Sequence, residues 1–140
     1  VLNAVISRWL LGQAAPQALP EEEPIQLDAH AWEGLAYLES VSGPGAIAEL
    51  VEDFDCDVFG RLAQMQEALD LGDLGTLAHL AHDLKSNAAT LGVLRISIDA
   101  ARLERLAREG ENLELAELIE GCRIRMPNVL RVLRERIPPA

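Results

Sequence analysis

The feature that most constrains the fold is a run of apolar residues spaced by three and four positions. Steps of 3, 4, 3, 4 and 3 connect Leu74, Leu77, Ala81, Leu84, Ala88 and Leu91. This spacing places all six side chains on one stripe of an α-helix, whereas a half-buried strand would alternate at every second residue. Similar stripes recur from Leu27 to the end of the chain, and no stretch alternates convincingly. The pattern therefore predicts an all-α fold.

The breaks between the stripes divide this region into helices joined by short loops. Glycines near positions 43, 72, 92 and 110 mark the breaks, since glycine commonly ends helices. The expected helices cover about 28–40, 44–71, 73–91, 93–109 and 112–137. Pro127 lies within the last range and is expected to kink that helix or divide it in two. One apolar stripe per helix and short loops predict an antiparallel up-and-down four-helix bundle with an additional N-terminal helix.

Three regions are expected along the chain. Residues 1–11 form a short amphipathic pattern typical of the end of a preceding domain. Residues 12–26 form a linker, because Pro16, Pro20, Pro24 and an acidic run cannot sustain a helix. Residues 27–140 form the helical bundle.

The composition excludes several classes of partner. Acidic residues outnumber basic ones 23 to 12, and the net charge of −11 argues against binding to nucleic acid or to an anionic membrane surface. No apolar run approaches the ~20 residues that span a bilayer, and no secretory signal is visible. Cys56 and Cys122 fit no zinc or redox spacing and indicate reduced thiols. We expect a soluble cytoplasmic domain.

His82 is the strongest candidate for chemistry. At 100° per residue, it lies about 135° from the centre of the apolar stripe, so its imidazole is expected to reach solvent. Lys85 follows at the next turn and can reach an anionic group attached to the imidazole. Small or polar residues nearby are expected to form a shallow platform where a partner docks: Ala78, Ser86, Asn87 and Ala89.

Glu104 is the best candidate for orienting the imidazole. It flanks the stripe of the next helix, and His82 and Glu104 lie ten and twelve residues from Gly92, which places them at similar heights in an antiparallel pair.

Alternatives remain open at this point. An exposed histidine is often only solvated surface, and Glu104 could simply pair with Arg108 at i+4. His79 and His82 lack further ligands at recognisable spacing, so no metal site is predicted. No phosphate-binding loop is present, so ATP binding is not expected.

Together these residues resemble the histidine phosphotransfer (HPt) domains of bacterial phosphorelays. The family motif is His-x-Leu-Lys-Gly followed by small residues and Leu-Gly. Here it runs from His82 through Leu84 and Lys85 to Leu91-Gly92, and Leu103-Glu104 matches the Leu-Glu pair of the family. The resemblance implies that His82 is phosphorylated, that Lys85 contacts the phosphoryl oxygens and that Glu104 orients the imidazole. Two positions depart from the common pattern: Ser86 replaces glycine, and Asn87 replaces serine or alanine. At the position of Glu104, family members often carry glutamine.

The resemblance also implies a function and partners. The domain is expected to accept a phosphoryl group from the aspartate of a response-regulator receiver domain and to pass it to another receiver, as a monomer. It needs no cofactor of its own, because the Mg²⁺ belongs to the receiver. Residues 1–11 look like the last helix of a receiver, which indicates the C-terminal module of a hybrid sensor histidine kinase, one that can be membrane-anchored elsewhere. The alternative is a non-catalytic helical module that binds receiver-like partners.

Overall fold

A computed structural model describes residues 25–137 of the chain. These residues form helices and contain no strand, only an isolated bridge between Leu27 and Val93. The helices are α1 (Ala29–Ser42), α2 (Ala46–Asp70), α3 (Leu74–Thr90), α4 (Leu94–Arg108) and α5 (Leu115–Arg136). The predicted all-α class is confirmed. The helix predicted for 1–11 and the linker up to residue 24 lie outside the described residues.

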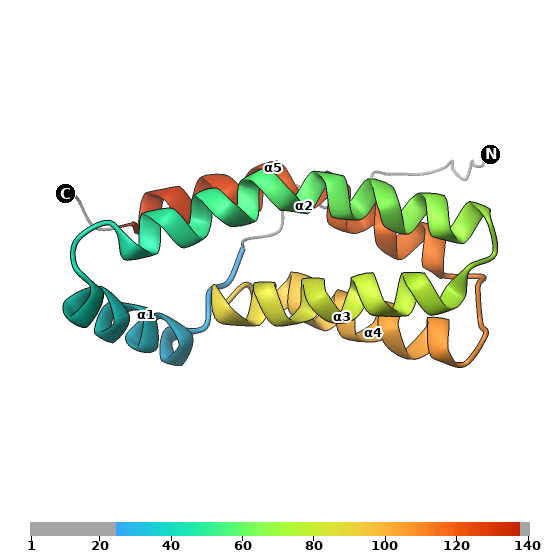
Figure 1. Cartoon of the computed structure of the whole chain (residues 1–140), viewed down its shortest axis with the longest axis horizontal. Coiled ribbons are helices and arrows are strands. Elements are labelled where there is room, and N and C mark those ends of the chain that lie inside the picture. Colours follow the sequence, from blue (N-terminus) through green and yellow to red (C-terminus); the bar gives the residue numbers. More distant parts are fainter. Residues whose placement is uncertain (1–24, 138–140) are drawn as a thin grey trace, which may run out of the picture.

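Helices α2 to α5 form the expected up-and-down bundle. In Figure 1, α2 and α5 lie side by side in one layer, and α3 and α4 lie side by side in the other. Each helix runs antiparallel to the one before it. The most extensive packing joins α3 to α4. Alanines at buried positions of both helices (81, 88, 100 and 107) let the two backbones approach closely.

Helix α1 fills a space that the shorter helices leave. Helix α2 has 25 residues and α3 has 17, so α2 extends about 12 Å further at 1.5 Å per residue. Figure 1 shows α1 beyond the end of α3 and α4, alongside the first half of α2. Trp32 and Leu35 of α1 are buried there. The Arg136 guanidinium also lies over the Trp32 ring, with its Cζ 5.4 Å from the ring centroid.

The turn from α3 to α4 is tight and buried. Gly92 adopts a φ of 71°, which glycine tolerates best. A Cβ at this position would meet the backbone nitrogen of Asp28 at 3.1 Å and Cδ1 of Trp32 at 3.1 Å. The Asp28 N–H also donates to the Gly92 carbonyl at 2.8 Å. The start of α1 therefore packs directly against this turn.

Helix α5 continues through Pro127 as one element. Of the two outcomes expected from the sequence, division into two helices is thus wrong. Pro127 is exposed, and so is Arg123, whose carbonyl loses the usual i+4 donor. Since water can reach that side of the helix, the missing hydrogen bond costs less than it would in the core.

Candidate functional site

The imidazole of His82 faces a carboxylate on the neighbouring helix. His82 lies in the middle of α3, and its side chain is 49% exposed. Its Nδ1 lies 3.2 Å from Oε2 and 3.3 Å from Oε1 of Glu104 on α4. Glu104 is only 13% exposed. The antiparallel pairing of α3 and α4 thus brings together two residues that are 22 positions apart.

Glu104 also binds two cations. Lys85 Nζ donates to Oε1 at 2.9 Å, and Arg108 donates to Oε2 from Nε at 3.1 Å and from Nη2 at 2.9 Å. These bonds, that from Lys85 first and those from Arg108 second, lower the pKa of Glu104 from 4.5 to about 2 against the opposing effect of partial burial. The His82 contact adds to the lowering. Glu104 is therefore a carboxylate at neutral pH.

An ionised carboxylate fixes the tautomer of neutral His82. Glu104 can only accept hydrogen bonds, so the proton of the neutral imidazole resides on Nδ1. Nε2 then carries the free lone pair, and no group within residues 25–137 bonds to it. A half-exposed ring with one nitrogen held and the other bare is arranged as a nucleophile.

The structure divides the residues predicted for partner docking. Ser86, Asn87 and Ala89 are exposed on α3, as expected. Ala78 is only 2% exposed, so its predicted place on an exposed platform is wrong. The physical reason is that α3 packs against both α2 and α4. Its buried stripe is therefore wider than the Leu/Ala seam and includes the edge where Ala78 lies.

Two arginines near the site, Arg108 and Arg61, make contacts that the sequence did not assign to the site. The sequence offers Arg108 only as an alternative partner for Glu104, yet it binds Glu104 together with His82 and Lys85. The i+4 spacing is the available signal. Arg61 of α2 donates to Asp83, the residue that follows His82, at 3.2 Å. It also binds Asp57 of its own helix. No spacing in the sequence pairs Arg61 with Asp83.

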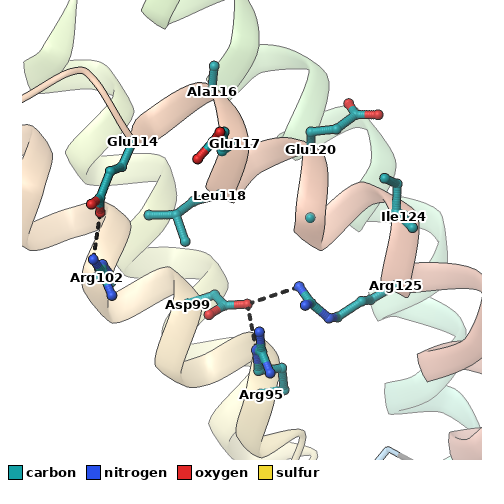
Figure 2. A pocket seen from close by; sticks show the side chains of 11 residues that line it. Arg95, Asp99, Arg102, Glu114, Ala116, Glu117, Leu118, Glu120, Ile124 and Arg125 are labelled. Atoms are coloured by element: carbon teal, nitrogen blue, oxygen red, sulfur yellow. Dashed lines mark hydrogen bonds and ion pairs between the residues drawn. The ribbon is translucent and has the colours of Figure 1, made fainter. Parts of the chain in front are cut away.

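A second group of charges lies on the other side of α4. Asp99 is 7% exposed and forms ion pairs with Arg95 at 3.2 Å and with Arg125 of α5 at 3.5 Å. Figure 2 shows these side chains converging in a groove between α4 and α5. The ion pair between Asp99 and Arg125 thus connects α4 to α5.

The described region carries no sign of a metal centre or a membrane span. In residues 25–137, no group of three or more His, Cys, Asp or Glu side chains is placed to hold a metal ion. None of the helices in this range is long and apolar enough to cross a bilayer.

Comparisons with known proteins identify the family. The profile of the Hpt domain family matches residues 49–136. Among solved structures, the chain is similar to histidine-containing phosphotransfer protein B (HptB) from Pseudomonas aeruginosa PAO1, with 28% sequence identity and a TM-score of 0.68. That match covers 78% of this chain and 91% of HptB. No curated protein sequence matches the chain. Since the profile spans more than half of the chain and includes both α3 and α4, the chain belongs to the Hpt domain family and acts as a phosphocarrier in two-component phosphorelays.

Proposed function

We propose that His82 is the residue that carries the phosphoryl group. The observation that supports this most directly is the hydrogen bond from Nδ1 to Glu104, which leaves the lone pair of Nε2 free on a half-exposed ring. His79, on the same helix, is also exposed. No such acceptor contacts its ring within the described residues. The two histidines therefore differ in the one feature that makes an imidazole a prepared nucleophile.

The proposed reaction takes place between His82 and a receiver domain. Nε2 attacks the phosphorus of the aspartyl phosphate in line with the leaving oxygen. The bond between phosphorus and that oxygen breaks, and its electron pair leaves with the aspartate carboxylate. The new Nε2–phosphorus bond leaves the ring with its proton on Nδ1. A second receiver reverses these steps by attack of its own aspartate.

The partner supplies the rest of the chemistry. Charge on the transferring group needs a divalent cation, and we assign Mg²⁺ to the receiver, so this domain uses no cofactor of its own. Lys85 contacts the phosphoryl oxygens, while Ser86, Asn87 and Ala89 form the docking face. Ser86, where the family commonly has glycine, adds a hydroxymethyl group to that face and narrows the set of receivers that fit. The domain works as a monomer in the cytoplasm, as one module of a hybrid kinase.

Phosphotransfer from a radiolabelled receiver tests the assignment. The wild-type chain and a His79→Gln variant should both take up label, and His82→Gln should take up none. His79→Gln is a matched control because it removes the same ring from the same helix. If His82→Gln is labelled as well as wild type, the assignment is wrong. Unchanged receiver binding with no phosphohistidine in the wild type would instead indicate a non-catalytic interaction module.

A further inference from the structure

We propose that Glu104 sets how readily His82 gives up its phosphoryl group, by competing for Lys85 and Arg108 and by holding the proton on Nδ1. This inference rests on the proposed role of His82 as the phosphoryl carrier. It concerns the charge of the Glu104 carboxylate. A glutamine amide at this position would keep the hydrogen bond to the ring but would lack that charge.

The first part of the argument is the distribution of charge. One carboxylate binds two cations, Lys85 and Arg108, through three hydrogen bonds of 2.9 to 3.1 Å. Because the same carboxylate also contacts Nδ1 of His82, both cations lie within about 6 Å of the imidazole. A phosphoryl group on Nε2 would bring close to two negative charges and several acceptor oxygens into this space. It must therefore draw both cations away from Glu104 or share them with it.

The second part concerns the proton on Nδ1. Once Nε2 is phosphorylated, a ring that keeps this proton carries a formal positive charge. A carboxylate accepts a hydrogen bond from a cation more strongly than a neutral acceptor does, because the two partners then carry opposite charges, so Glu104 favours the protonated ring. When the nitrogen–phosphorus bond then breaks, its electron pair returns to Nε2 and neutral imidazole leaves. Without the proton, the leaving group would be the much more basic imidazolide.

Both effects act in the same direction. The carboxylate withholds cations that would stabilise the phosphoryl group, and it maintains the ring in the form that leaves easily. A glutamine at this position would release Lys85 and Arg108 to the phosphoryl oxygens and hold the proton less strongly. Glu104 is thus a positioning residue that makes this chain a labile, readily discharged carrier.

The test compares the lifetime of phosphohistidine in two variants that break the same ion pair. After labelling by a receiver and removal of that receiver, Glu104→Gln should lose label about five-fold more slowly than wild type. Arg108→Gln should lose it about two- to three-fold faster, because a cation is lost while the carboxylate remains. At equilibrium with the receiver, the fraction of label on the chain should change in the same two directions. Arg105→Gln, which removes the same charge from an exposed neighbouring position of α4, should behave as wild type.

The opposite signs separate this role from a structural one. If the ion pair only supports the fold, both variants should lose label faster, and that result would overturn the inference. An unchanged lifetime in Glu104→Gln would overturn it as well, while leaving His82 as the labelled residue. Failure of the phosphocarrier assignment would look different, since His82→Gln would then be labelled. If Glu104→Gln does not fold, Arg108→Gln still tests the inference, because an unchanged or slower loss of label in that variant would overturn it.

Discussion

The indole N–H of Trp32 donates a 2.8 Å hydrogen bond to the carbonyl oxygen of Leu91, 59 residues further along the chain. This bond connects α1 to the residue that ends α3. It is buried, and a buried carbonyl without a donor would cost free energy. Because α3 carries His82, helix α1 stabilises the end of the helix that bears the proposed phosphoacceptor.

The contacts around the turn at Gly92 predict a specific sensitivity there. Gly92→Ala should lower the free energy of unfolding by about 2–3 kcal/mol, since the new Cβ meets Asp28 and Trp32 in addition to the strain of a positive φ. Gly110 has a similar φ of 77°, but a Cβ added there would meet no described atom within 4 Å. Gly110→Ala should therefore cost only about 1 kcal/mol. Urea unfolding followed by circular dichroism measures both values, and equal losses would contradict the packing described for α1.

The buried ion pairs of Asp99 predict that a substitution far from His82 strongly lowers the free energy of unfolding. Asp99→Asn should lower the free energy of unfolding by about 3 kcal/mol, because Arg95 and Arg125 lose the carboxylate between them and the Arg125 side chain is 11% exposed. Glu114→Gln breaks the exposed ion pair with Arg102 and should cost less than about 1 kcal/mol. Chemical denaturation of the two variants provides the comparison. A small effect for Asp99→Asn would contradict a stabilising role for its ion pairs between α4 and α5.

The pKa of Glu104 predicts how its contribution to stability changes with pH. Its folded-state pKa of about 2 lies below its ordinary value of 4.5, so the unfolded chain binds the proton more strongly. The stabilisation is complete above about pH 5 and is lost as the pH falls through the interval from 4.5 to about 2. The difference in unfolding free energy between wild type and Glu104→Gln should be constant near neutrality and shrink across that interval. A difference independent of pH would show that the carboxylate charge does not stabilise the fold.

The two thiols should differ in reactivity. Cys122 is buried, and burial first, with Asp99 second, raises its pKa to about 12. Cys56 is exposed, although its pKa is also raised, by desolvation first and then by Glu52. Because the thiolate is the reactive form, iodoacetamide should modify Cys56 slowly and leave Cys122 unmodified until the chain unfolds. Mass spectrometry of native and denatured protein measures this, with Cys56→Ala as the control that should take up no label in the native state. Labelling of Cys122 in that variant would contradict the buried position in α5.

The sequence predicted features that depend on one helix at a time. The spacing from Leu74 to Leu91 predicted α3, because burial of an apolar stripe repeats with the period of the helix itself. The distances of His82 and Glu104 from Gly92 predicted that they meet, since antiparallel helices joined by a short turn have a fixed relative height. The width of the buried stripe could not be predicted in this way. Ala78 is covered because α3 has neighbours on two sides, which its own periodicity does not specify.

The apolar spacing within single helices also could not predict contacts between distant segments of the chain. Nothing local pairs Arg61 with Asp83, or Trp32 with Leu91, because these contacts depend on how whole helices pack. Arg108 is an intermediate case: its i+4 spacing from Glu104 predicted the ion pair, but the simultaneous contact with His82 and Lys85 depends on the approach of α4 to α3. The experiments above test the roles of His82 and Glu104, and the role of Lys85 stays a prediction.

The pairing of His82 with Glu104 across the turn at Leu91–Val93 has a consequence for chain length. One residue inserted into α4 between Leu94 and Glu104 would rotate Glu104 by about 100° around the helix axis and shift it by about 1.5 Å, which would carry it away from the imidazole. The connection between α4 and α5, residues 109–114, follows all four site residues, so its length does not affect how they meet. The four site residues are His82, Lys85, Glu104 and Arg108. Insertions and deletions should therefore accumulate in that connection among functional descendants of this sequence, while the interval of 22 residues from the histidine to the carboxylate stays fixed.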